Sequence, residues 1–493
     1  MNLRNLLKKE DKRRLLLLEY LYFNKKDATN MDLLQVTKSS LPILREDIQQ
    51  INQQIPELKI ERVQSGYRLR HLPGFSLDSL YSRLIGQTTE MQLLHLLLQE
   101  NCKVQTEAAE RLFISTTSCN RLLKKLAEIL AEIEVRIERN PLRLCGNEPF
   151  IRYLFTKYFK EHRKNNVTFF PETDLDQRLS QWIVSFLKEN RLDEQYLLHE
   201  QLVIAASVAI LRLQKGHSMV ACSADKSFIL SEPQLLTEIQ QEALGKNIPY
   251  FIEEILWPYF TDSYFLSTNH FTAAKKNNPW VAKVYGFAEY YLQELEQHFS
   301  LSLPSQKRQQ ILQLLCDENL IYTKNGDIVT ILRNDRHHFI EDYQQNYPNE
   351  LQQLHQFIDH FRLKYRVRIT SDQRYHQLFI LLTALPDLLE KLMPPLRILV
   401  MSDIAPFHGQ FLKEKAHQLL DGNLIFSTIE NIFDHHHLIQ QQLQQFDLLL
   451  TTFELLHTFP ELPVITIKAA PSLEDFQKIQ RTINHLIRTR EPS

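Results

Sequence analysis

The sequence predicts a mainly α-helical chain of several domains that ends in a small open α/β sheet. Its 493 residues exceed what a single hydrophobic core usually holds. Only 10 of those residues are glycine, which argues against a large all-β protein or a glycine-rich nucleotide-binding enzyme. Apolar residues recur at helical spacing through most of the chain, and the pattern changes to alternating strands and helices after the double proline at 394–395.

The composition is that of a folded protein, with 43% hydrophobic and 24% charged residues. The five cysteines form no CxxC pair, so neither a zinc site nor a disulfide framework is predicted. The N-terminus lacks a signal-peptide core and no apolar run reaches membrane-spanning length, so we expect a cytoplasmic protein without a membrane partner or cofactor. The net charge of −2 divides into +4 over residues 1–150 and −6 over the remainder, which permits nucleic-acid binding by the N-terminal part.

A helix-turn-helix pattern with a following wing lies between residues 106 and 144. A short helix over 106–113 precedes Ser115, which is a good N-cap for a second helix. That second helix carries an apolar stripe at helical spacing, and VRIERNPLRL (135–144) predicts the two short strands of a wing. Hydroxyl and basic side chains at a helix N-terminus suit phosphate and base-edge contacts in a major groove. The candidate DNA-binding residues of this unit are Ser115, Thr116, Thr117, Asn120, Arg121, Lys124, Arg139 and Arg143.

The same pattern occurs once earlier in the chain. Two tandem copies, each with a wing, favour DNA binding over ordinary trihelical packing, which is the alternative for either copy alone. The three helices and the hairpin of this first unit are predicted over 11–23, 30–38, 39–55 and 58–70. Its candidate DNA-binding residues are Ser40, Arg45, Arg62 and Arg68.

Three segments carry a resemblance to a known family. They are GYRLR (66–70), ISTTSCNRLLKKL (114–126) and RLCGNEPFIRYLF (143–155), of which the last matches an L-x-G-x-E-x-x-I-R exit from a DNA-binding unit. With these segments the chain resembles the Mga-type transcription regulators of Gram-positive bacteria and their sugar-antiterminator-type relatives. The resemblance implies winged helix-turn-helix units at 1–73 and 74–165, all-helical bundles like phosphotransferase-system regulation domains at 166–292 and 293–393, and a domain like the sugar-transporter IIB component at 394–493.

The middle of the chain is predicted to form the two all-helical bundles. Helical patterns run over 194–219, 304–322 and 338–361, with a break near 290–303. The resemblance implies that histidines here accept phosphate from the phosphorelay proteins of the sugar phosphotransferase system. The antiterminator relatives place a histidine seven residues before an arginine, whereas Ala205 holds that place before Arg212 in this chain. A plain polar or core role is the alternative for each phosphorylation candidate, namely His199, His217, His270, His355, His360 and His376.

The C-terminal part is predicted to form an open α/β sheet of the IIB type. A working IIB phosphocarrier has a cysteine after its first strand, where this chain has Ser402 followed by a loop with one glycine. Since a hydroxyl does not form the reactive anion that a thiol forms near neutral pH, we expect a sensor or homodimerisation domain instead. The histidines at 435–437 are expected to lie solvated at a helix start and to bind no metal. The predicted strands and closing helix are 397–401, 423–429, 446–452, 463–468 and 472–490.

These observations predict a non-enzymatic, DNA-binding transcription activator. Its expected partners are double-stranded promoter DNA, a second copy of the chain through the C-terminal domain, and the phosphorelay proteins, with RNA polymerase as a further candidate. An RNA-binding antiterminator and a IIB-type phosphocarrier are the alternatives. The helical N-terminus argues against the first, because such antiterminators begin with a short β-rich domain, and Ser402 argues against the second.

Overall fold

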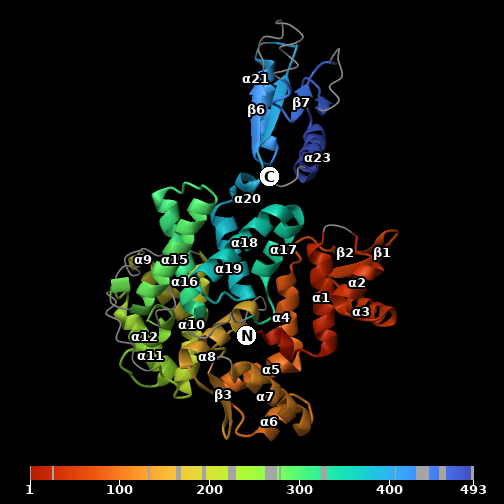
Figure 1. Ribbon diagram of the computed structural model, residues 1–493. Helices are drawn as coiled ribbons and strands as arrows, with labels where there is room; N and C mark the ends of the chain where they lie inside the picture. Colours follow the sequence, from red (N-terminus) through yellow and green to blue (C-terminus); the bar gives the residue numbers. More distant parts are fainter. Residues whose placement is uncertain are drawn as a thin grey trace. The chain divides into compact units, whose positions relative to one another are not determined.

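The computed structural model is mainly helical, with a small parallel sheet near the C-terminus (Figure 1). The predicted helical fold class is confirmed at this level. Two compact units make up the chain, the first from residues 1–294, 303–342 and 366–377, and the second from residues 295–302, 343–365 and 378–493. The division into five domains stays a prediction. The structure describes residues 2–24, 27–131, 134–162, 168–190, 196–219, 229–260, 275–276, 279–323, 330–405, 407–428, 443–454 and 462–489.

The first winged unit has three helices and a hairpin where the sequence predicts them. A capping box starts its second helix, because the Thr29 hydroxyl accepts the Asp32 backbone N–H while the Asp32 carboxylate accepts that of Thr29. The hairpin needs glycine at Gly66, where φ is +147° and a Cβ atom would lie 2.1 Å from the carbonyl oxygen of Ala28. The elements are η1 (Leu3–Leu6), α1 (Lys9–Phe23), α2 (Asn30–Thr37), α3 (Leu41–Gln54), β1 (Leu58–Val63) and β2 (Gly66–His71).

The second winged unit repeats this order of three helices and a hairpin after one further helix. The inner face of its recognition helix is buried at Cys119, Leu123, Leu126 and Leu130, as the predicted apolar stripe requires. The antiparallel wing pairs Val135 with Gly146. The elements are α4 (Leu77–Gln87), α5 (Thr89–Gln99), α6 (Gln105–Arg111), α7 (Thr116–Ala131), β3 (Val135–Arg139) and β4 (Leu142–Gly146).

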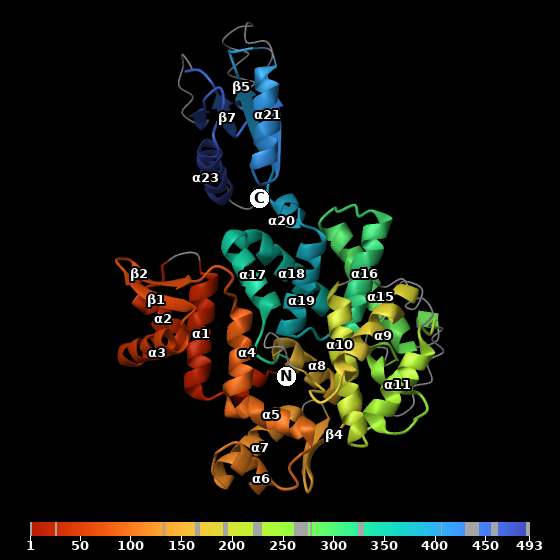
Figure 2. The ribbon, with the colours of Figure 1, turned by 180° about the vertical axis from the view of Figure 1, so that it is seen from behind.

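A single hydrophobic core continues from the winged units into the helices that follow. It joins the buried face of α8 (Glu148–His162), represented by Leu154 and Phe155, to Val208 of α10 (Tyr196–Gln214) and to Leu332. A separate cluster packs α9 (Leu175–Glu189), α11 (Pro233–Leu244) and α12 (Phe251–Ile255) around the other side of α10. Figure 2 shows α8 beside α10. The winged units are therefore built into the first compact unit.

The remaining helices correct two sequence predictions. The helix before the predicted break at 290–303 continues to His298, so the break begins after that residue. The predicted helix over 338–361 is two helices, because Pro348 has no backbone N–H to continue the first and instead starts the second. Among the described residues, no helix is long and apolar enough to cross a membrane. The bounds are α13 (Trp257–Phe260), α15 (Pro279–His298), α16 (Ser305–Thr323), α17 (Asp335–Asn346), α18 (Pro348–Tyr365), α19 (Ser371–Ala384) and α20 (Leu388–Leu392).

The C-terminal sheet has four parallel strands in the order β6-β5-β7-β8. Its central strand β5 is buried at five of six positions, which explains its continuous apolar sequence. Hydrophobic residues between Met393 and Ile487 form the two clusters on the faces of this sheet. The elements are β5 (Leu396–Met401), α21 (His408–Leu419), β6 (Leu424–Thr428), β7 (Leu448–Thr451), β8 (Val464–Thr466) and α23 (Leu473–Thr489).

Candidate nucleic-acid interface

The recognition helix α7 of the second winged unit is capped as predicted. The Ser115 hydroxyl oxygen accepts the backbone N–H of Ser118 at 3.1 Å, which satisfies one free donor at the helix start. The same pattern predicts Ser40 as the N-cap of α3 in the first unit, and this prediction is wrong in part. Ser40 occupies the N-cap position of α3, but its side chain makes no capping hydrogen bond. Pro42 is the second residue of that helix and has no N–H to offer.

The solvent face of α7 carries the polar residues that the sequence predicts. Thr117, Arg121 and Lys124 follow one another at intervals of four and three residues, so they lie on one side of the helix, and all three are exposed. Ser115 and Thr116 are exposed at its N-terminal end. Because the opposite face is fixed in the hydrophobic core, this side is directed outward.

Two predicted contact residues are bonded to each other. The Arg139 guanidinium at the wing donates to the Asn120 side-chain oxygen at 2.9 Å and to the Gln105 side-chain oxygen at 3.1 Å. The start of α6, the recognition helix and the wing are thereby joined by one polar cluster. Asn120 and Arg139 thus hold the recognition helix and the wing in a fixed relation, in addition to any contact with a ligand. Gln105 is not among the contact residues that the sequence predicts.

The second wing has fewer free cations than its sequence indicates. Arg143 is half-buried and lies opposite Glu138 in the hairpin, with a side-chain ion pair of 2.9 Å. This hydrogen bond is the main reason that the pKa of the Glu138 carboxyl lies below its usual value. Arg136 lies 3.7 Å from the same carboxylate. A DNA phosphate would therefore have to compete with the Glu138 carboxylate for the Arg143 guanidinium.

The first winged unit has the less basic recognition helix. Its recognition helix α3 has one cation, Arg45, and two carboxylates, whereas α7 has three cations and one carboxylate. Arg45 and Arg62 are exposed, but Arg68 donates two hydrogen bonds to Asp27, at 2.6 and 3.0 Å. Local electrostatic attraction for a polyanion is therefore stronger at α7 than at α3.

Two side chains of α3 that no sequence pattern predicts position the first unit. Asp47 is 1% exposed and is bound by Arg13 and by Arg14, the latter at 2.9 Å. The Asn52 amide accepts the backbone N–H of Ile60 at 2.7 Å and donates to its carbonyl at 3.0 Å, which ties the helix to the wing. No spacing rule identifies such contacts, since they depend on the packing of separate elements.

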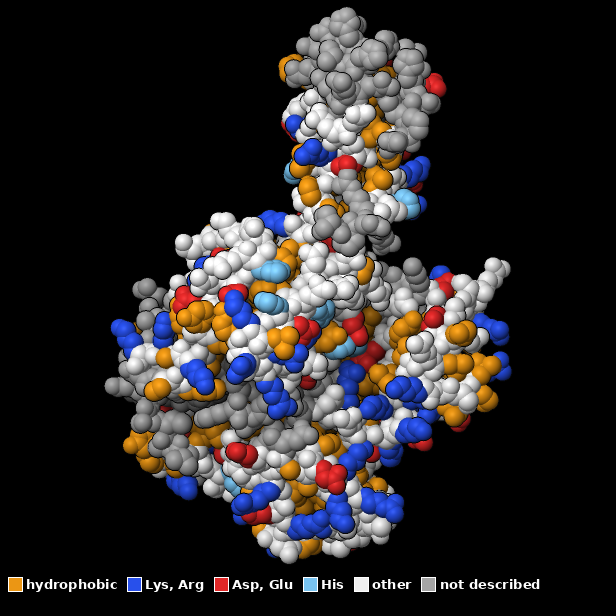
Figure 3. Space-filling model, viewed as in Figure 1, with side chains coloured by type: hydrophobic (Ala, Val, Ile, Leu, Met, Phe, Trp, Pro, Cys, Tyr) orange, Lys and Arg blue, Asp and Glu red, His pale blue; other side chains and the backbone are white. Residues whose placement is uncertain are grey.

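Lys and Arg side chains gather over the second unit on the surface of the first compact unit. Figure 3 shows them over the part of the surface where Figure 1 places α6 and α7. Residues 73–159 match a family model described as the Mga helix-turn-helix domain. The resemblance to the Mga-type transcription regulators is confirmed. The Mga match contains the whole second winged unit and most of α8.

Two curated relatives extend the Mga-type resemblance. A protein of Streptococcus pneumoniae serotype 4, named as a trans-acting regulator, is 21% identical over 429 residues, which are 84% of this chain and 85% of the relative. The capsule synthesis positive regulator AcpA of Bacillus anthracis is 23% identical over 217 residues, which are 43% of this chain and 44% of that relative. The first relative thus covers most of the chain, beyond the helix-turn-helix match.

The Mga-type exit motif forms a buried ionic network. Glu148 lies 3.1 Å from the Arg152 guanidinium and 2.7 Å from that of Arg212, and both arginine side chains are fully buried. Arg212 also pairs with Glu100 at 2.7 Å, and Arg152 with Glu254 at 2.7 Å. The network joins the end of the second winged unit to α10, on which Arg212 lies. It explains why the motif has a carboxylate and an arginine four residues apart.

Two phosphorylation candidates lie on or directly after α10. His199 is half-buried, with its Nε2 atom 3.2 Å from the Ser180 hydroxyl. His217 Nε2 lies 2.6 Å from the Glu100 carboxylate, so this histidine belongs to the exit network. The Nε2 atom of each of these histidines therefore has a partner within the chain.

The other phosphorylation candidates are dispersed. His376 on α19 is hydrogen-bonded to Arg336 through Nδ1. His355 is half-buried and His360 exposed, both on α18. His270 lies outside the described residues.

Ser402 follows the central strand of the C-terminal sheet, as predicted, and its hydroxyl is already engaged. His408 Nδ1 lies 2.7 Å from the Ser402 hydroxyl, and His408 Nε2 lies 2.7 Å from the carbonyl oxygen of Ala469. The Ser402 oxygen also accepts the backbone N–H of Ile404 at 3.2 Å. These bonds tie Ser402 and His408 to each other and to the segment that follows β8. The histidines at 435–437 lie outside the described residues.

Proposed function

We propose that the chain is a DNA-binding transcription activator of the Mga type that contacts duplex DNA mainly through α7. The observation that carries this proposal is the exposed side of α7, where Thr117, Arg121 and Lys124 stand opposite a fully packed face. A helix with a polar, basic N-terminal half fits the major groove, where arginine and hydroxyl groups meet base edges and phosphates. The positive regulator among the relatives supports activation as the direction of control.

The remaining predicted residues complete this interface. Thr116 and Ser115 lie at the end of α7 that would enter the groove first, and Asn120 sits beside them. Arg139 sets the wing against α7, and the first winged unit adds Arg45 and Arg62 as a weaker second contact. Arg68 and Arg143 are expected to contribute less, because each is held by a carboxylate. Ser40 lies at the N-terminal end of α3 without a capping hydrogen bond and belongs to the weaker contact of the first unit.

Salt-dependent DNA affinity tests the role of α7. The variant Arg121→Ala/Lys124→Ala should bind promoter DNA more weakly, and the slope of log affinity against log salt should flatten by about two units. Lys188→Ala/Lys246→Ala is the matched control, since it removes the same charge from exposed positions on α9 and after α11. Equal slopes for the two double variants would contradict the assignment of α7. An RNA hairpin that competes as well as duplex DNA would favour the antiterminator alternative.

We further propose that phosphorylation by the sugar phosphotransferase system tunes this regulator through His199. His199 and Arg212 share the helix α10, and Arg212 pairs with Glu148 at the exit of the second winged unit. A phosphoryl group adds up to two negative charges and can shift the packing of the helix that carries it. His376, whose neighbour Arg336 could pair with a phosphoryl group, is the second candidate.

Promoter activity in cells tests this regulatory part. His199→Asp, a partial charge mimic, and His199→Ala should change activity in opposite directions, while both full-length proteins keep their affinity for free duplex DNA. If both variants and the same changes at His376 behave as wild type, phosphorylation control at these sites is wrong. His360→Asp is a control for an exposed charge elsewhere.

We also propose that the C-terminal sheet mediates homodimerisation. Its outer strands β6 and β8 have one unpaired edge each within the described sheet. Phe407 is 85% exposed and Phe411 45% exposed at the start of α21, which provides apolar area for a second copy. Two linked chains would hold four winged units on one DNA segment and raise affinity by effective concentration.

A further inference from the structure

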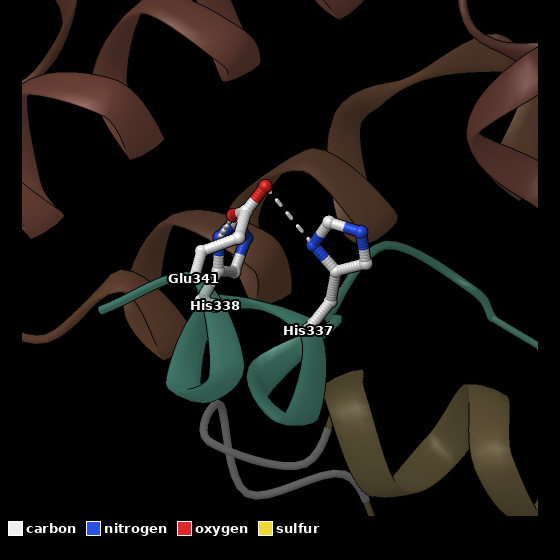
Figure 4. A group of neighbouring side chains, drawn as sticks. All are labelled: His337, His338 and Glu341. Atoms are coloured by element: carbon white, nitrogen blue, oxygen red, sulfur yellow. Dashed lines mark hydrogen bonds and ion pairs between the residues drawn. The ribbon is translucent and has the colours of Figure 1, made fainter. Parts of the chain in front are cut away.

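Three potential metal ligands converge in the first turns of α17. His337, His338 and Glu341 each offer one nitrogen or oxygen atom, and these atoms lie within 4.8 Å of one another. Figure 4 shows the Glu341 carboxylate between the two imidazole rings. Neighbouring helical residues point about 100° apart, so two adjacent histidines alone do not converge. Glu341 changes this, because it lies three and four residues further on and therefore between them.

Each histidine lies at the separation of two ligands on a tetrahedral ion from a different oxygen of the Glu341 carboxylate. His337 Nδ1 lies 3.3 Å from one Glu341 oxygen, and His338 Nδ1 lies 3.3 Å from the other. Two ligand atoms that are each about 2.0 Å from a tetrahedral zinc ion are themselves about 3.3 Å apart. Two imidazole nitrogens and one carboxylate are a common ligand set for Zn²⁺ that leaves a fourth position for water.

The residues around His338 hold its imidazole ring in one orientation, which favours metal binding. Its Nε2 atom is buried without a hydrogen bond and lies 3.6 Å from the Glu19 carboxylate. Glu19 is itself held by Arg4 at 2.9 Å and by the Tyr81 hydroxyl at 2.6 Å. A carboxylate behind a ligating histidine sets the tautomer and orientation of the ring. The ring of Phe23 stacks on His338 at 4.4 Å between centroids and limits its rotation.

The outer side of the cluster is open to an ion. The His337 side chain is 30% exposed and that of Glu341 51% exposed, whereas that of His338 is 15% exposed. We propose that His337, His338 and Glu341 form a Zn²⁺ site that is completed by water and backed by Glu19. The alternative is an ion-paired cluster of protonated histidines around Glu341, which would bind no metal. The site does not depend on DNA binding by α7.

Metal titration of the full chain distinguishes these two arrangements. The test uses a background in which the histidines at 435–437 are replaced by glutamine, so that they take up no metal. Calorimetric titration with Zn²⁺ should show one saturable equivalent, and Co²⁺ should give the strong visible absorption of four-coordinate cobalt. His337→Gln and Glu341→Gln should each weaken binding at least tenfold. His360→Gln, at an exposed histidine on α18, should leave it unchanged.

Two results would overturn the proposal. One is the absence of saturable Zn²⁺ binding by the background chain. The other is binding that is equal in His337→Gln, Glu341→Gln and the background, which would place the metal elsewhere. Both substituted side chains are partly exposed, so the variants should fold, and unchanged circular dichroism checks that they do.

Discussion

Replacing Arg212 by methionine should destabilise the first compact unit strongly. The guanidinium is fully buried and bonds Glu100 at 2.7 Å, Glu148 at 2.7 and 3.0 Å, and the carbonyl oxygen of Leu144 at 3.2 Å. Methionine fills much of the volume of the arginine side chain. It leaves the buried carboxylates of Glu100 and Glu148 without the positive charge and the hydrogen bonds of Arg212. Removing one partner from a buried ion pair costs about 3–5 kcal/mol. The lower end applies here, because Arg152 stays 3.1 Å from Glu148.

Urea unfolding followed by tryptophan fluorescence measures this cost. Trp182 and Trp257 are both buried, and the Trp257 indole N–H donates to the carbonyl of Ala205 on α10, so unfolding of this region changes their emission. Arg178→Met is the control, because Arg178 is partly exposed and pairs with Glu238 and Glu242, and a pair in contact with solvent contributes about 0–1 kcal/mol. If Arg212→Met and Arg178→Met lower the free energy of unfolding equally, the exit network has no structural importance.

Three further outcomes follow from single features. Ser115→Ala should lower the free energy of unfolding by about 1 kcal/mol, whereas Ser40→Ala, at a position that caps nothing, should change it little. Burial raises the pKa of the Glu161 carboxyl from about 4.5 to about 7, so the folded state keeps a proton that the unfolded state has lost. The contribution of Glu161 to stability should therefore fall as pH rises through this window, and Glu161→Gln should remove that contribution from the pH dependence of unfolding. A chain truncated after residue 393 should sediment as a monomer, while the full chain sediments as a dimer.

Each of these outcomes has a result that would contradict it. Equal losses in Ser115→Ala and Ser40→Ala would show that the cap is unimportant. A Glu161→Gln protein with the wild-type pH profile between about pH 4.5 and 7 would mean that another group titrates there. If residues 1–393 and the full chain have the same oligomeric state in sedimentation, self-association does not depend on the C-terminal sheet.

Local patterns made much of the fold predictable. The N-cap at Ser115, the apolar stripe of α7 and the wing after it depend on residues that are near one another in sequence, and all three were predicted. The apolar strands after 394–395 were predictable for the same reason, since a buried parallel strand has a continuous apolar sequence. The missed start of α18 at Pro348 was open to prediction, because proline favours the first turn of a helix.

Long-range contacts set the limit of what sequence patterns reveal. Arg212 lies 64 residues from Glu148 and 112 from Glu100, and only tertiary packing brings the three side chains together. The same holds for His338, whose neighbours Glu19 and Phe23 belong to α1. The wing gives a third example. Arg143, a predicted DNA contact, is ion-paired with Glu138 because the pairing of the two strands sets these residues opposite each other. The pairing partner depends on register, which hydrophobic periodicity alone did not reveal.

The continuous core around α8 limits how the chain can be divided. Leu154 and Phe155 of that helix share one hydrophobic cluster with Val208 of α10 and with Leu332, which lies far along the chain. A fragment that ends with the second wing or with α8 would therefore expose apolar residues that later helices cover in the full chain. A fragment for the study of the winged units should accordingly keep the helices that close this core.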